Sequence, residues 1–258
     1  MYCYTRFCVY AVFCFPSTHT LLQYLRRNAR AKSNLRFANI EHLYQKWSIC
    51  PDVYDRVLHG LARNVKRGPF TATSGIVVPY YLNASTNFLD TNIASDIITL
   101  FAKVLAGWLP KLQGDTKYLV CGMEMAGGIL AAQLASANIE GLNQLGDFVY
   151  IRKERKTSGT CQQLEGPNFI TARTSDSPVV TGVWVDDANS TGSSLQAGIK
   201  MLKAQYNIDI NHALYLVDRF QDRQSLPDQK QYLASALFDG VEIKALYDLE
   251  QVDRLVNS

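Results

Sequence analysis

The 258-residue sequence lacks several patterns that would assign it to a common class of protein. No apolar run approaches the about 20 residues that cross a bilayer, and the stretch Cys8–Phe15 (CVYAVFCF) is far too short, so no membrane partner is predicted. Neither GxxxxGK[ST] nor GxGxxG occurs, which disfavours nucleotide hydrolysis and dinucleotide binding. What remains is a chain, 47% hydrophobic and 19% charged, that is large enough to bury a substantial core.

Two further absences are informative: the cysteines lack a metal-binding spacing, and residues 1–40 lack acidic residues. The six cysteines show no CxxC or Cys/His spacing, which disfavours a metal cage or a disulfide framework and favours a reducing compartment. Residues 1–40 contain no acid and six basic residues: Arg6, Arg26, Arg27, Arg30, Lys32 and Arg36. Subtracting these six from the 26 basic residues leaves 20 against 23 acids. No nucleic-acid partner is predicted, because binding a polyanion needs positive charge on a folded face.

Residues 1–37 are predicted to be an N-terminal extension, and residues 38–258 one domain with a small hood at about 38–90. An Arg-rich, acid-free start that contains Ser and Thr is typical of an organelle transit peptide. An unstructured extension or a misassigned start codon fits equally well. The predicted location is therefore the cytoplasm, or an organelle if residues 1–37 are a transit peptide.

Strand-length apolar runs alternate with helical patterns in the second half of the chain. The predicted strands are Lys117–Gly122, Asp147–Arg152, Val179–Asp186, His212–Asp218 and Val241–Tyr247, and the predicted helices between them are Met125–Ala137, Gly192–Tyr206 and Asp228–Phe238. This alternation predicts an α/β fold with a central parallel sheet of about five strands, flanked by helices. Another helix is expected at Asp90–Leu109, and Pro69–Ser85 is expected to form short strands of the hood. Ligands bind such sheets beyond the carboxyl ends of the strands.

The stretch Gly182–Leu195 (GVWVDDANSTGSSL) lies at such a strand end. Small residues between a strand and a helix let backbone N–H groups and the helix dipole form a cradle for a phosphate. The adjacent acids would repel a polyphosphate unless they faced hydroxyl groups or a metal. A sugar phosphate offers a phosphate for the cradle and vicinal hydroxyl groups for the aspartates. The structural alternative is that Asp186 and Asp187 merely end a strand and a Ser or Thr caps the helix.

Four ordered segments resemble the orotate phosphoribosyltransferase family of type I phosphoribosyltransferases. An apolar triplet, two acids and then Thr-Gly resembles its phosphoribosyl pyrophosphate signature, and FVYIRKERKTSG (148–159) resembles its cationic loop. TATSGIVVPYYLNAS (71–85) resembles its hood, and CGMEMAGGILAAQLA (121–135) its pyrophosphate loop. Without that resemblance, a charge run such as RKERK is usually a solvated surface loop. The likeness covers the chain from about residue 40 to its C-terminus.

The resemblance implies transfer of 5-phosphoribosyl from phosphoribosyl pyrophosphate to orotate, with Mg²⁺ held mainly by substrate. It implies a homodimer in which loop 152–166 is shared between subunits. The catalytic residues would be Asp186, Asp187, Lys153 and Lys156. Substrate would be bound by Arg152, Ala188, Asn189, Ser190, Thr191, Gly192, Ser193, Arg219, Tyr80 and Tyr81. Arg219 would meet the orotate carboxylate, for which an arginine fork is suited; a surface ion pair with Asp218 or Asp222 is the structural alternative.

The sequence departs from the family pattern around the pyrophosphate. Thr73 and Ser158 replace a lysine and a histidine, and a frequent cation is replaced by Ala126 or Gly127. Each lost charge-assisted hydrogen bond costs about 1.5 to 3 kcal/mol where it is made, unless the additional Arg155 compensates. Two alternatives therefore stay open: a related enzyme acting on another base, and a non-catalytic regulator that senses phosphoribosyl pyrophosphate.

Overall fold

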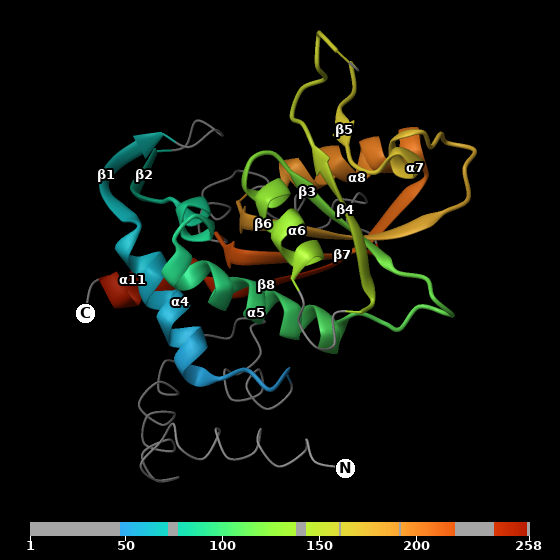
Figure 1. Ribbon diagram of the computed structural model, residues 1–258. Coiled ribbons are helices and arrows are strands. Elements are labelled where there is room, and N and C mark those ends of the chain that lie inside the picture. The colour runs from blue at the N-terminus through green and yellow to red at the C-terminus, as the bar shows by residue number, and fades with distance from the viewer. Residues whose placement is uncertain are drawn as a thin grey trace, which may run out of the picture. The chain divides into compact units, whose positions relative to one another are not determined.

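The computed structural model describes residues 47–71, 77–137, 143–159, 161–190, 192–219 and 240–256 (Figure 1). The chain divides into two compact units, Met1–Asp55 and Arg56–Ser258. Within the first unit, the described residues 47–55 include the start of α4 (Pro51–Arg63), which continues into the second. The predicted extension 1–37, the predicted helix Asp228–Phe238 and the site residue Thr191 lie outside the described residues.

A six-stranded sheet forms the centre of the second unit. Its strands, in spatial order, are β5 (Leu164–Glu165), β4 (Leu145–Ile151), β3 (Tyr118–Met123), β6 (Val180–Asn189), β7 (Ile208–Asp218) and β8 (Glu242–Asp248). All neighbouring pairs are parallel except β4 and β5, which are antiparallel. The predicted α/β fold with about five parallel strands is confirmed. The antiparallel edge strand β5 was not predicted, because two residues carry no periodicity.

Helices cover both faces of this sheet. They are α5 (Thr91–Trp108), α6 (Ala126–Ser136), the short α7 (Asn168–Thr171), α8 (Ser193–Tyr206) and, at the C-terminus, α11 (Leu249–Val256). A Cβ on Gly128 of α6 would lie 2.1 Å from the Tyr150 ring, so α6 packs on the face that carries Tyr150. The neighbours Val149 and Ile151 instead join the buried cluster beneath α8. Since side chains alternate along a strand, α6 and α8 lie on opposite faces.

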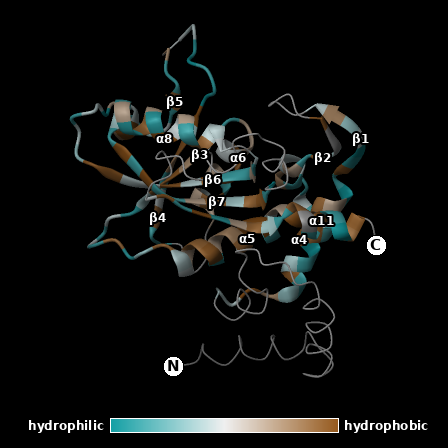
Figure 2. Ribbon diagram, turned by 180° about the vertical axis from the view of Figure 1, so that it is seen from behind, coloured by the Kyte–Doolittle hydropathy of each residue, from teal (hydrophilic) through white to brown (hydrophobic). Residues whose placement is uncertain are grey.

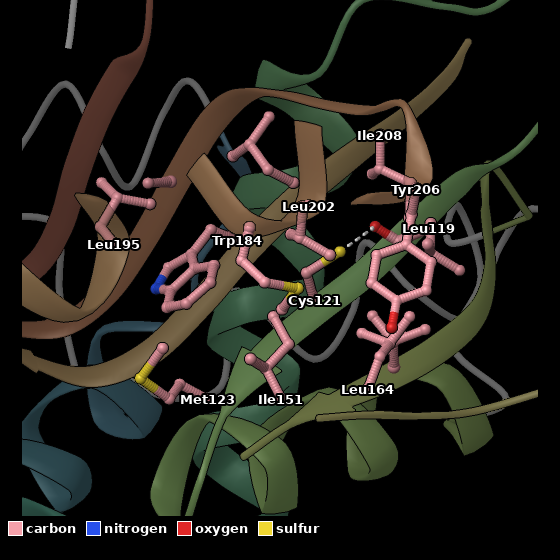
Figure 3. Close-up of a cluster of buried hydrophobic side chains, with 14 of the residues drawn as sticks. Leu119, Cys121, Met123, Ile151, Leu164, Trp184, Leu195, Leu202, Tyr206 and Ile208 are labelled. Atoms are coloured by element: carbon pink, nitrogen blue, oxygen red, sulfur yellow. Dashed lines mark hydrogen bonds between the residues drawn. The ribbon is translucent and has the colours of Figure 1, made fainter. Parts of the chain in front are cut away.

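The core on the α8 face is built around the fully buried Trp184 of β6 (Figure 3). Leu195 and Leu202 of α8 join it in the same cluster. A Cβ on Gly198 would lie 2.3 Å from the Trp184 ring, so the glycine lets α8 approach β6 closely. This packing fixes the position of α8, and therefore of its N-terminus, relative to the end of β6. In the described part of the chain, no helix has the length and apolar character needed to cross a membrane.

The predicted short strands before α5 form a separate antiparallel ribbon, β1 (Val65–Thr71) and β2 (Val77–Leu82). The 3-10 helix η1 (Ala84–Phe88) follows it. The fully buried Asn87 of η1 donates to the Ala84 carbonyl (3.0 Å) and accepts from the side-chain amide of Asn64 (2.9 Å). Because Asn64 precedes β1 and η1 follows β2, this amide pair ties together the two ends of the ribbon.

Candidate active site

The strands β3, β4, β6 and β7 end at one edge of the sheet, where polar residues follow each of them. Backbone hydrogen bonds connect the chain just beyond neighbouring strands: the Glu124 N–H donates to the Ile151 carbonyl (2.7 Å) and the Arg219 N–H to the Asn189 carbonyl (2.8 Å). Parallel α/β sheets bind ligands at this edge. The structure therefore brings most of the predicted site residues to the edge where ligands are expected.

Strand β6 is longer than predicted and contains the acid pair. It pairs with β7 through Asp186, opposite Tyr215, to Asn189, opposite Asp218. The predicted end of this strand at Asp186 is therefore wrong, because the strand continues through Ala188 to Asn189. The reason is that the 11-residue β7 continues to offer hydrogen-bond partners beyond the point where the apolar run of β6 ends. The part of the cradle outside the strand begins at Ser190.

The two carboxyl groups differ in burial and in the charges that face them. Asp186 is 9% exposed, and its Oδ1 accepts a hydrogen bond from the Asp187 N–H (3.0 Å). Burial raises the pKa of Asp186 well above its ordinary value, the charge of Asp187 raises it further, and the charge of Lys153 opposes this. Burial likewise raises the pKa of Asp187, against hydrogen bonds to that carboxylate and the charge of Arg219. The charge of Lys153, which follows β4, thus acts on Asp186, and the charge of Arg219, which follows β7, acts on Asp187.

Helix α6 begins against this pair. A Cβ on Gly127 would lie 2.8 Å from the Val185 carbonyl oxygen and 3.0 Å from Oδ1 of Asp186. Such contacts leave no room for a side chain, so a cation at residue 127 is sterically excluded. The glycine allows the first turn of α6 to lie directly beside the buried carboxylate.

The N-terminus of α8 faces the same strand end. Gly192 has a φ of +69°, in the left-handed region that glycine adopts without steric cost, and α8 starts at the next residue, Ser193. The N–H groups of a helix's first turn have no partner within the helix and carry a partial positive charge. Ser190, Gly192 and Ser193 therefore lie where an anion cradle is predicted.

The cationic segment is the tip of a β-hairpin between β4 and β5. The Arg152 N–H donates to the Gln163 carbonyl (2.9 Å), and the Gln163 side-chain amide donates back to the Arg152 carbonyl (3.0 Å). Figure 1 shows this hairpin projecting from the body, and Figure 2 shows that it is largely hydrophilic. All residues from Lys153 to Gly159 are exposed. This stretch of the loop is therefore open to solvent.

Two glutamates, which the sequence patterns did not single out, organise the cations. Glu165 Oε1 lies 3.1 Å from Arg152 Nε and 3.4 Å from Lys156 Nζ. Glu124 accepts from the Lys153 N–H (3.0 Å) and from the Tyr150 hydroxyl (3.3 Å). Glu124 directly follows β3, so a search of all strand ends would have found it. No local pattern identifies Glu165, because only the pairing of β5 with β4 brings it to Arg152.

The two hood tyrosines lie on β2, opposite Lys66 and Arg67 of β1. Tyr81 is 41% exposed, and its ring centroid is 5.8 Å from that of Phe70. Tyr80 is partly buried. The Tyr81 ring thus contacts a residue of the same ribbon. That Tyr80 and Tyr81 cover the base of the substrate stays a prediction.

Comparisons with known proteins place this geometry in a family, although no family model matches the sequence. The orotate phosphoribosyltransferase of Staphylothermus marinus is 30% identical over 169 residues, which are 65% of this chain and 72% of that protein. The enzyme of the same name from Thermosynechococcus vestitus is 27% identical over 208 residues, 80% of this chain and 96% of that protein. A solved structure of Mycobacterium tuberculosis orotate phosphoribosyltransferase, in complex with 5-phospho-alpha-D-ribosyl 1-diphosphate, is 14% identical in sequence. It matches 80% of this chain and 94% of that one with a TM-score of 0.52, which shows a common fold. The buried acid pair, the cationic hairpin and this similarity together show that the chain belongs to the orotate phosphoribosyltransferase family of pentosyltransferases.

Proposed function

We propose that the protein transfers the 5-phosphoribosyl group of phosphoribosyl pyrophosphate to orotate, giving orotidine 5′-phosphate and pyrophosphate. The observation that carries this proposal is the acid pair Asp186 and Asp187 near the end of β6. The charge of Lys153 acts on Asp186, and the charge of Arg219 acts on Asp187. The site offers one group for each of the three parts of this donor. The acids suit the ribose hydroxyls, the helix N-terminus suits the 5′-phosphate, and the cations suit the pyrophosphate.

The acid pair has two roles in the proposed reaction. Its carboxylates accept hydrogen bonds from the ribose hydroxyls, and they stabilise the positive charge that develops on the ring in an oxocarbenium-like transition state. Burial strengthens this electrostatic stabilisation, because the attraction between opposite charges is stronger in a low-dielectric site than in water. The raised pKa of both acids means that the ligand-free site resists ionisation. The positive charge that develops on the ribose ring lowers the pKa of both acids and so favours their ionised forms.

The other residues bind the ends of the two substrates. Ser190, Thr191, Gly192 and Ser193, with the N-terminus of α8, hold the 5′-phosphate. Lys153, Lys156 and Arg152 bind the departing pyrophosphate, and loop closure excludes water from the site. Arg219 binds the orotate carboxylate, while Tyr80 and Tyr81 cover the base.

Mg²⁺ fits this site as a substrate-bound ion. Among the residues that the structure describes, no group of three or more His, Cys, Asp or Glu could hold a metal ion. Asp186 and Asp187 nevertheless supply the oxygen ligands that Mg²⁺ prefers, and ribose and pyrophosphate oxygens would supply the rest. When bound, the ion neutralises charge on the leaving pyrophosphate. The protein's own contribution is to orient the substrate through the acid pair and the cationic loop.

The choice of base is tested by following pyrophosphate release with phosphoribosyl pyrophosphate, Mg²⁺ and one base at a time. Orotate should support turnover, whereas adenine and hypoxanthine should not, because they lack the carboxylate that Arg219 would bind. Uracil, which lacks only that carboxylate, is the matched control and should be turned over far more slowly than orotate. Turnover with another base alone would refute orotate specificity. Binding of phosphoribosyl pyrophosphate without turnover of any base would favour a regulator.

Sharing of the loop between two subunits is tested by mixing inactive variants. If Lys156 acts in the partner's site, Lys156→Ala mixed with Asp186→Asn/Asp187→Asn gives heterodimers with one intact site. Random exchange of equal amounts makes half of the dimers heterodimers, so about one quarter of wild-type activity should return. Mixing Lys156→Ala with the triple variant Lys156→Ala/Asp186→Asn/Asp187→Asn is the control, since every site then lacks Lys156. No recovery in the first mixture, with subunit exchange verified, would contradict a shared loop.

A further inference from the structure

Glu165 connects the two arms of the cationic hairpin. Strand pairing places it opposite Tyr150, at the root of the loop. There its Oε1 accepts a hydrogen bond from Arg152 Nε at 3.1 Å and lies 3.4 Å from Lys156 Nζ. Burial alone would raise the pKa of Glu165, but the hydrogen bonds from Arg152 and Lys156 bring it below its ordinary value. One carboxylate thus contacts two of the three cations assigned to pyrophosphate.

The Arg152 guanidinium is held from two sides. Its Cζ lies 5.6 Å from the centroid of the Tyr150 ring, and its Nε edge faces Glu165. The Tyr150 hydroxyl in turn donates to Glu124 Oε2 (3.3 Å), which limits movement of the ring. In the hydrogen bonds found among the described residues, this guanidinium uses only its Nε. No hydrogen bond of its two terminal nitrogens is found among the described residues, so both can donate to phosphate oxygens.

We infer that Glu165 is a positioning residue, which orients Arg152 and Lys156 for the pyrophosphate group of the donor. The inference rests on the proposed function, because it assigns a role within the same site. The reverse role would be an internal competitor that neutralises these cations. The two roles predict opposite signs: removing a competing acid should tighten pyrophosphate binding, whereas removing a positioning acid should weaken it. Contact through Nε favours positioning, since it leaves both terminal nitrogens of Arg152 to donate to phosphate oxygens.

The test measures the binding of Mg²⁺-pyrophosphate by calorimetry to the full chain. Glu165→Gln should weaken binding about fivefold, which is the scale of a partly exposed ion pair. Glu165→Asp keeps the charge but shortens the side chain, and it should weaken binding as well. The matched control is Glu154→Gln, which removes one negative charge from the exposed tip of the same loop. Glu154 has no ion pair among the described residues, so this variant should bind pyrophosphate as well as wild type or more tightly.

A double-mutant cycle separates positioning from a general effect on the hairpin. If Glu165 acts through Arg152 and Lys156, Glu165→Gln should have little further effect on pyrophosphate binding when both cations are already glutamine. Tighter binding by Glu165→Gln, or the same loss in both backgrounds, would overturn the inference. A wild-type protein that binds no Mg²⁺-pyrophosphate would overturn the proposed function and this inference together. Normal wild-type binding with unaffected Glu165 variants would overturn the inference alone.

Discussion

Replacing both Asp186 and Asp187 by asparagine should lower kcat by about 1,000-fold or more, on the scale of losing a preorganised electrostatic stabiliser of the transition state. The amides keep the size of the side chains but cannot supply negative charge to a developing cation. The same variant should be more stable than wild type in the absence of ligand, because burial disfavours both ionised carboxylates. Initial rates and thermal unfolding of one preparation measure the two effects.

The gain in stability should depend on pH in a defined direction. The folded-state pKa of each acid is raised, so between the unfolded pKa of about 3.9 and the folded value the native state binds more protons than the unfolded state. Wild-type stability therefore falls as pH rises through this window, at a cost of about 1.4 kcal/mol for each pH unit that the pKa is raised. The difference in Tm between variant and wild type should be small near pH 4 and larger at neutral pH.

A surface acid provides the control for this pH dependence. Asp115 is exposed in the connection that precedes β3, away from the strand ends that carry the acid pair. Asp115→Asn should leave both kcat and the pH dependence of Tm close to wild type. Undiminished activity of the Asp186/Asp187 variant would show that the site is misplaced. If the pH dependence of the variant's Tm equalled that of wild type, the pKa values of the two acids would not be raised by folding.

Replacing Gly122 by alanine should have the largest effect on folding. A Cβ on Gly122 would lie 1.9 Å from the Gly127 carbonyl oxygen and 2.8 Å from the Gly128 nitrogen. These are backbone atoms of α6 and cannot move aside as a flexible side chain would, so β3 and the start of α6 must separate. We expect a loss of about 3 kcal/mol or more in the free energy of unfolding, at the upper end for overpacked sites. Urea denaturation followed by circular dichroism measures it.

The same substitution should reach the active site. Gly127 lies beside Asp186, so moving the first turn of α6 disturbs the buried carboxylate, and transfer activity should fall beyond the loss of folded protein. Gly114→Asn is the control: Gly114 has a φ of +59°, a Cβ added there would have no heavy atom within 4 Å, and asparagine tolerates that backbone region. A Gly122→Ala protein within about 0.5 kcal/mol of wild type would contradict the close approach of α6 to β3.

Local chemistry in the sequence was sufficient to predict the fold class and the main parts of the site. Strand-length apolar runs that alternate with helical patterns predicted the parallel sheet, which the pairing of its strands confirms. The acid pair, the small residues after it and the RKERK segment were each recognisable because their chemistry is contiguous in the chain. The roles proposed for these residues in catalysis stay predictions, since each depends on a bound substrate.

Tertiary structure alone decided which groups surround the acid pair and the cationic segment. Pairing with β7 extends β6 to Asn189, although the apolar pattern ends earlier. Pairing of β5 with β4 brings Glu165 to Arg152, 13 residues away, and the close packing of α6 brings Gly127 to Asp186 across 59 residues. Such contacts leave no periodic or local signal, because their energy comes from backbone hydrogen bonds and packing between distant segments. The sequence by itself thus determined the chemical groups of the site, and the fold determined their burial, charge environment and orientation.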